Sequence, residues 1–191
     1  ALNTPESQAP KAGNCDGVTR IAILGGGPAA CATAMGLAKL GLKPIIIGHP
    51  RRRQGIEGFS SRTLDTLKSL GALGALSTIG GQVRRYSDWN GTRSNSSHEY
   101  LLRRSQFDAA ILQDAANMGV EIIDGKVLSA QASGPTWDVK FRTENGCSSP
   151  RHIAADFLIE ARGRAAPRLG QTLSYGPPAF SIGQHWTLKV A

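Results

Sequence analysis

Several features that mark other classes of protein are missing from this chain. Its three cysteines, Cys15, Cys31 and Cys147, are widely spaced and form neither a C-x-x-C pair nor a cluster with histidine. This spacing argues against a zinc site and a disulfide scaffold, and the odd count favours a reducing compartment. No apolar run approaches the roughly 18 residues of a membrane span. We therefore expect a cytoplasmic protein with no bound metal and no membrane span.

Aromatic and acidic residues are also scarce. Aromatic residues make up 6% of the 191 residues, and 14 acidic residues face 22 lysines and arginines, which gives a formal net charge of +8. This balance favours anionic partners such as phosphates, acidic substrates or nucleic acid. No basic and aromatic array indicates a surface for base stacking, so we expect no specific nucleic-acid partner. Hydrophobic residues reach 40%, which predicts a folded domain with a sizeable core.

Motifs of hydrolytic and triad chemistry are absent as well. No Gly-Lys-Ser/Thr follows the glycine-rich stretch, which excludes a Walker phosphate loop, and no G-x-S-x-G indicates a hydrolase nucleophile. The four histidines are scattered without the spacing of a catalytic triad: His49, His98, His152 and His185. The residues alone therefore name no catalytic group.

The N-terminal part does carry a recognisable pattern. The apolar run Val18–Leu24 predicts a buried parallel strand, the small residues from Pro28 onwards predict a helix that ends at Gly41, and "KPIIIG" predicts a second strand. Between strand and helix, Gly25 to Ala30 fit G-x-G-x-x-A. This order is the context that a dinucleotide-binding βαβ unit requires. A glycine turn in an ordinary α/β protein is the alternative interpretation.

Each fingerprint position has a physical role in that interpretation. Gly25 makes the tight turn, Gly27 lets a pyrophosphate approach the backbone, and Ala30 packs where the helix meets the strand. The helix N-terminus adds unpaired N–H groups and the positive end of the helix dipole. The second strand, however, lacks the expected carboxylate. His49 and three arginines (51–53) follow Gly48 there, and the arginines alone suggest the 2′-phosphate of an NADP-binding reductase.

The rest of the chain predicts a parallel sheet with an antiparallel β insertion. A helix is expected in "SSRTLDTLKSLGALGAL", and a longer one in "SQFDAAILQDAANMG". The strands "QVRRYSDW" and "HEYLLR" are expected to be joined by the polar turn "NGTRSNSS". Further strands are expected in "VEIID", "KVLSAQA", "TWDVKFRT", "RHIAADFLIEARG" and "AFSIGQHWTLKV". The predicted class is α/β with a Rossmann-like βαβ start.

Three of these segments resemble flavin-dependent monooxygenases and halogenases. "GIEGFSSRTLDTLKSLG" resembles their Gly-Glu segment and the helix after it. "YLLRRSQFDAAILQDAANMGVEIIDGKV" is similar to their "R-x-x-F/L-D" helix and strand, and "ADFLIEARGRAAPR" to a later strand and turn. With the glycine fingerprint, the resemblance spans residues 20–168. It implies an FAD-binding fold like that of p-hydroxybenzoate hydroxylase.

The resemblance also implies functions for particular residues. Its cofactor-binding positions correspond to Gly25, Gly27, Pro28, Ala29, Ala30, Glu57, Arg104, Val127, Ala161 and Gly163. Arg104 would reach the FAD phosphates, and Val127 would lie beside the adenine. Because the ribose carboxylate is missing here, a backbone carbonyl, His49 or water would serve the ribose. One or two of Arg51, Arg52 and Arg53 would face the FAD phosphates or an incoming NAD(P)H. Arg162 stands where the family usually has Ser or Thr, so the match is weaker there.

The family implies an activity and a larger protein. Members hydroxylate aromatic small molecules, or hydroxylate or halogenate tryptophan, including peptidyl tryptophan during quinone-cofactor maturation. The sequence of this chain is closest to that last subgroup in its "GIEGFS" segment and in its missing ribose carboxylate. The polar residues 1–17 predict a flexible tail. The family's second FAD fingerprint is absent, so we expect an incomplete FAD-binding domain at 18–175, the start of a substrate domain at 176–191, and the remaining half of the enzyme as a partner. A halogenase, a non-catalytic nucleotide-binding module and an NADP-binding reductase are the alternatives.

Overall fold

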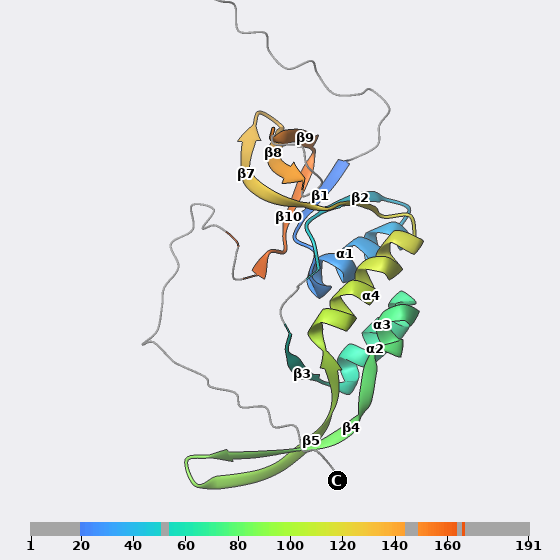
Figure 1. The fold of residues 1–191 in the computed structure, drawn as a ribbon, viewed down its shortest axis with the longest axis vertical. Helices are drawn as coiled ribbons and strands as arrows, with labels where there is room; N and C mark the ends of the chain where they lie inside the picture. The colour runs from blue at the N-terminus through green and yellow to red at the C-terminus, as the bar shows by residue number, and fades with distance from the viewer. Residues whose placement is uncertain (1–19, 51–53, 144–148, 164–165, 167–191) are drawn as a thin grey trace, which may run out of the picture.

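A computed structural model describes residues 20–50, 54–143, 149–163 and 166 of the chain (Figure 1). The expected tail at 1–17, the arginines at 51–53 and the expected substrate-domain start at 176–191 lie outside the described residues. The elements follow in the order β1 (Arg20–Leu24), α1 (Pro28–Lys39), β2 (Lys43–Ile47), β3 (Ile56–Phe59), α2 (Ser61–Leu70), α3 (Leu73–Ser77), β4 (Ile79–Trp89), β5 (Thr92–Arg103), α4 (Arg104–Asn117), β6 (Glu121–Ile123), β7 (Gly125–Ser133), β8 (Thr136–Thr143), β9 (Arg151–Ala155) and β10 (Phe157–Glu160).

A four-stranded parallel sheet is the centre of the fold. Its strand order is β10-β1-β2-β6, and all three neighbouring pairs are parallel. Two three-stranded antiparallel sheets interrupt this sheet in the sequence, with orders β3-β5-β4 and β7-β8-β9. The predicted α/β class with a parallel sheet and an antiparallel insertion is confirmed, and the structure adds the second insertion.

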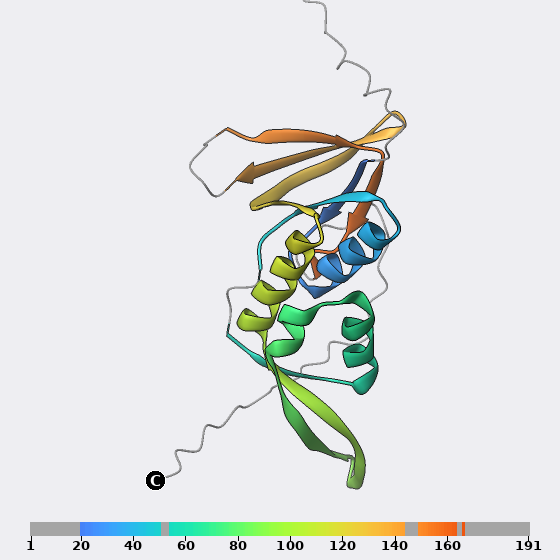
Figure 2. The same cartoon turned by 90° about the vertical axis from the view of Figure 1, so that its right-hand side faces the viewer.

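After their exposed first residues, Arg20 and Lys43, the central strands β1 and β2 are apolar because both of their faces are covered. Ile21 and Ile23 of β1 belong to the hydrophobic cluster that contains the helices, whereas Ala22 and Leu24 belong to a second cluster with β8 and β9. Figure 2 shows the resulting layers, with the β7–β9 sheet on one side of β1 and β2 and the helices on the other. Side chains alternate between the faces of a strand, so one short apolar run supplies both layers.

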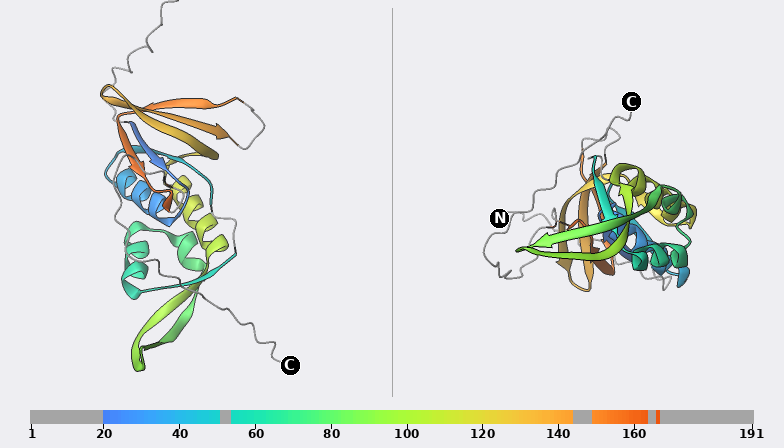
Figure 3. Two further views of the ribbon diagram at one scale, coloured as in Figure 1. Left: turned by 90° about the vertical axis from the view of Figure 1, so that its left-hand side faces the viewer. Right: turned by 90° about the horizontal axis from the view of Figure 1, so that it is seen from below.

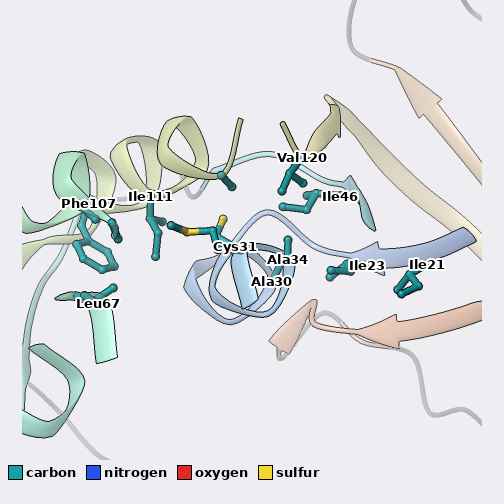
Figure 4. Close-up of a cluster of buried hydrophobic side chains, with 14 of the residues drawn as sticks. Ile21, Ile23, Ala30, Cys31, Ala34, Ile46, Leu67, Phe107, Ile111 and Val120 are labelled. Carbon is teal, nitrogen blue, oxygen red and sulfur yellow. The ribbon is translucent and has the colours of Figure 1, made fainter. Parts of the chain in front are cut away.

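Small side chains bring α1 close to the sheet and to α4. Ala30, Cys31 and Ala34 are fully buried, and Cys31 lies opposite Ile111 of α4 in the core (Figure 4). Gly41 follows α1 with a φ of 78°, and Gly119 follows α4 with a φ of 84°. Both are left-handed positions, which glycine tolerates best at a helix end. Among the described helices, none is long and apolar enough to cross a membrane.

The predicted polar turn after β4 is wrong. Only Asn90 and Gly91 connect β4 to β5, and the next residues continue as strand. The φ angles of these two residues are 51° and 76°, the pattern of a tight type I′ hairpin turn. The polar sequence suggested a turn, but most of it continues as strand. This part of the hairpin extends away from the helices, as Figure 3 shows. A strand that buries neither face has no need for apolar alternation.

The single strand expected in "RHIAADFLIEARG" is in fact two strands. β9 pairs antiparallel with β8, whereas β10 pairs parallel with β1. The chain changes sheet at Asp156, whose carboxylate accepts a hydrogen bond of 2.7 Å from the backbone N–H of Arg20. The single polar residue Asp156 does not reveal such a change, because Ala155 of β9 and Leu158 of β10 pack in the same hydrophobic cluster.

The predicted helix around Leu64–Leu76 is likewise divided. Gly71 has a φ of 77° and ends α2, and the short α3 follows. Asp114 of α4 caps α3: its carboxylate accepts hydrogen bonds from the backbone N–H groups of Gly74 at 3.0 Å and Ala75 at 2.8 Å. A Cβ on Gly74 would lie 2.7 Å from Asp114 Oδ1, so this contact needs glycine.

We expect Asp114→Asn to destabilise the full-length protein. The amide nitrogen cannot accept the second backbone hydrogen bond, and a buried unpaired donor costs about 1–3 kcal/mol. Thermal and urea unfolding measure the change. Asp65→Asn is the control, because Asp65 is exposed and forms a surface ion pair with Lys68. A surface pair of this kind contributes at most about 1 kcal/mol. Equal stability of the two variants would contradict the capping of α3 by Asp114.

Candidate functional site

The glycine fingerprint lies where β1 ends, among the carboxyl ends of its neighbours. Gly25 donates a hydrogen bond of 2.8 Å to the carbonyl of Ile47 at the end of β2. Its φ is 116°, and an added Cβ would lie 2.6 Å from the carbonyl oxygen of Ala161, which follows β10. The tight turn that the sequence predicts at Gly25 is therefore present, and it requires glycine.

Two further glycines allow the backbones of this region to touch. A Cβ on Gly26 would lie 2.5 Å from the carbonyl oxygen of His49, and one on Gly48 would lie 2.5 Å from the backbone carbon of Gly25. The sequence analysis assigned no such function to Gly26 or Gly48. A signal existed for Gly48, since a glycine directly after a buried strand often marks a close backbone approach.

Gly27 differs from Gly25 and Gly26 in the space around it. It has an extended backbone with a φ of −87° at the N-cap of α1. No heavy atom of the described residues lies within 4 Å of where its Cβ would be. Open space therefore borders the first turn of α1, where Pro28 and Ala29 stand, whereas Ala30 is fully buried. This helix end offers backbone N–H groups and the positive dipole end.

Sheet topology explains why these residues meet. From β1 the chain proceeds through α1 to β2 on one side, while β10 lies on the other side of β1. Such a reversal of strand order opens a crevice outside the carboxyl ends of the strands. Gly25, Gly48 and Ala161 all follow strand ends at that edge.

His49 lies at the same edge and has an unusual feature. Its Nδ1 is buried and has no hydrogen-bond partner among the described residues. Buried polar atoms in proteins are nearly always paired, so this nitrogen is available to another group. Arg51, Arg52 and Arg53 follow directly and lie outside the described residues.

A cavity of about 320 Å³ lies beside the first turn of α1. Its walls are mostly apolar, and they include Pro28, Ala29, Phe59, Leu67 and Phe107. Glu57 and Arg104 supply the charged part of the lining. The structure thus brings together two predicted site residues that are 47 positions apart in the sequence: Arg104 Nη1 donates a hydrogen bond of 2.6 Å to Glu57 Oε2.

Arg104 is also held from its other side. Its Nε and Nη2 donate hydrogen bonds of 2.9 Å each to the two carboxylate oxygens of Asp108. The hydrogen bond to Asp108 is the main cause that raises the pKa of Arg104 above its ordinary value. Burial, and secondarily the charge of Asp108, raise the pKa of Cys31 to about 12. Asp108 was missed as a functional candidate, although it stands in the R-x-x-F-D motif four residues after Arg104.

Of the remaining predicted residues, Ala161 and Gly163 follow β10 at the same edge. Ala161 donates a hydrogen bond of 2.9 Å to the carbonyl of Leu24, and Gly163 has a φ of 60°. Arg162, which departs from the family pattern, folds back onto Glu160 through Nε at 2.8 Å. Val127 is partly buried against the second cluster, near the start of β7, and no described hydrogen bond joins it to the other predicted residues.

Comparison with known proteins identifies structures to which this chain is similar. Neither a protein-family model nor a curated protein matches the sequence. Solved structures do match. The peptidyl tryptophan dihydroxylase QhpG, essential for tryptophylquinone cofactor biogenesis, has a TM-score of 0.67 and 35% identity, covering 82% of this chain and 35% of that one. The resemblance to flavin-dependent monooxygenases and halogenases that the sequence predicts is confirmed by these structures.

Solved structures of lower identity share the fold. CmlS, a flavin-dependent halogenase, has a TM-score of 0.61 and 19% identity, covering 80% of this chain and 30% of its own. A flavoprotein/dehydrogenase from Cytophaga hutchinsonii has a TM-score of 0.60 and 22% identity, covering 76% and 39%. The chain therefore spans about a third of the length of these structures, between 30% and 39%.

We expect Gly26→Ala to destabilise the full-length protein by about 1–3 kcal/mol, because the new methyl group overlaps the backbone of His49. Gly36→Ala is the matched control. Gly36 lies inside α1, and its Cβ would meet no described atom within 4 Å, so alanine should stabilise by about 0.5–1 kcal/mol. Thermal unfolding measures both changes. A Gly26→Ala protein as stable as Gly36→Ala would refute the close approach.

Proposed function

We propose that this chain is part of an FAD-dependent monooxygenase that hydroxylates an aromatic or indole substrate, namely peptidyl tryptophan during maturation of a quinone cofactor. The observation that carries the proposal is the 35% identity with peptidyl tryptophan dihydroxylase QhpG over 82% of the chain. The glycine turn, the open α1 N-terminus and the neighbouring cavity supply the physical argument.

The residues present fit a dinucleotide. Beside Gly27 the backbone of the α1 N-terminus is open, as a pyrophosphate requires. Arg104 adds a fork-shaped cation, which suits phosphate oxygens, and the unpaired Nδ1 of His49 adds a polar group where the family's ribose carboxylate is missing. The cavity between α1, β3 and α4 is mostly apolar, which suits a ring system or an aliphatic chain.

In this proposal each predicted residue has one task. The backbone from Gly25 to Ala30 holds the pyrophosphate, Arg104 reaches a phosphate, and Glu57 accepts a hydrogen bond from Arg104 at the cavity. His49 serves the ribose, Val127 the adenine, and Ala161 and Gly163 line the turn next to the dinucleotide. Arg51, Arg52 and Arg53 serve the FAD phosphates or NAD(P)H as the electron donor.

Bound FAD supplies the oxidising chemistry with dioxygen, and the protein binds, orients and excludes water. The described residues belong to the FAD-binding domain at 18–175, and the substrate domain begins at 176–191. The remainder of the same enzyme completes the site, the substrate is a peptide or protein, and the compartment is the cytoplasm.

The full-length protein tests this function directly. We expect purified protein to release FAD on denaturation and, with NAD(P)H or a flavin reductase and dioxygen, to add oxygen to tryptophan in a peptide. Mass spectrometry of the peptide measures the product. A colourless protein that takes up no FAD would contradict the cofactor, and a halogenated product would contradict hydroxylation.

We expect Gly27→Ala to fold normally and to bind FAD at least about tenfold more weakly, because its methyl group takes the space that the pyrophosphate needs. Titration of the apoprotein with FAD measures the affinity, and thermal unfolding checks the fold. Gly36→Ala, on the same helix but away from its N-terminus, should bind FAD like the wild type. An unchanged affinity of Gly27→Ala for FAD would show that the pyrophosphate does not bind at this helix end.

A further inference from the structure

We propose that Asp108 is a positioning residue of the dinucleotide site, which holds the Arg104 guanidinium so that its Nη1 end faces the cavity and the cofactor phosphates. The inference rests on the proposed function, since it assumes that the cavity beside α1 receives part of FAD. It adds a residue that neither the glycine fingerprint nor the cavity lining contains.

Two carboxylates accept hydrogen bonds from the guanidinium of Arg104, and two of its N–H donors remain for a ligand. Asp108 accepts from Nε and Nη2, and Glu57 accepts from Nη1. These hydrogen bonds use three of the five N–H donors of arginine, so one on Nη1 and one on Nη2 have no partner among the described residues. Arginine in this orientation presents donors to an anion without having to turn.

Burial shows which carboxylate fixes the orientation. The Asp108 side chain is 0% exposed, whereas that of Glu57 is 50% exposed and that of Arg104 is 16% exposed. A buried carboxylate needs its partner, because separation would leave a charge without solvent. Glu57 can exchange its bond with water or with a phosphate at lower cost. Asp108 is therefore the fixed side of the guanidinium, and Glu57 the exchangeable side.

The backbone around Arg104 is fixed as well. Its N–H donates a hydrogen bond of 2.9 Å to the carbonyl of Gly55, which ties the start of α4 to the segment before β3. Asp108 lies one turn further along α4, so the helix itself sets the distance between the two side chains. The contribution of Asp108 to the raised pKa of Cys31 agrees with its position against α1. Functional side chains held by such a supporting group lose less freedom when they bind a ligand.

A purely structural function is the competing explanation, because the same ion pairs join β3 to α4. FAD affinity of the full-length apoprotein separates the two. We expect Asp108→Asn to weaken FAD binding about tenfold, since the neutral amide no longer fixes the fork. Asp114→Asn is the matched control: it removes another buried carboxylate from α4, one that bonds α3 and not Arg104. It should lower thermal stability and leave FAD affinity within about twofold.

An Arg104→Lys background tests whether Asp108 acts through Arg104. Lysine has no fork to orient, so Asp108→Asn should then change FAD affinity by less than about twofold. An equally large effect in both backgrounds, equal weakening by Asp108→Asn and Asp114→Asn, or no weakening by Asp108→Asn would overturn the inference. Wild-type protein that binds no FAD would overturn the proposed function, and the inference with it.

If Asp108→Asn does not fold, a crystal structure of the FAD-bound wild-type protein tests whether Asp108 positions Arg104. We expect Nε and Nη2 of Arg104 to remain on Asp108, and Nη1 to donate to an FAD oxygen. A guanidinium turned away from Asp108, or one beyond hydrogen-bond distance of FAD, would contradict the inference.

Discussion

The close approach of three backbone segments at the carboxyl edge of the parallel sheet is the constraint on which the rest of the site depends. Gly25 and Gly26 lie against Gly48, His49 and Ala161 at distances that no side chain would permit. This contact brings the ends of β1, β2 and β10 together and directs the chain into α1. Beside these contacts, the position of a Cβ on Gly27, at the N-cap of α1, borders open space.

Two layers keep that edge in place. Alternate residues of β1 enter the helical cluster and the cluster under the β7–β9 sheet, so the strand is held from both faces. The helical layer also carries the second half of the site, since α4 begins with Arg104 and buries Asp108 against α1. Core packing and the charge arrangement at the cavity are thus properties of the same helix.

Several features were predictable because local chemistry controls them. The fingerprint at Gly25 to Ala30 and the ends of α1 and α4 at Gly41 and Gly119 follow from glycine conformation. The errors arose where tertiary context overrides local pattern. The polar half of β5 is a strand because the type I′ turn at Asn90 and Gly91 and its pairing with β4 determine it, not an apolar face.

The sequence by itself determined the α/β class, the βαβ start, the glycine turn and most of the residues around it, because short-range periodicity and backbone chemistry encode them. Only the tertiary structure decided which distant residues meet. Glu57 pairs with Arg104 across 47 positions, Asp114 caps α3 across 39 and 40 positions, and the chain changes sheet at Asp156. These contacts depend on how helices and sheets pack, and no local pattern specifies that packing.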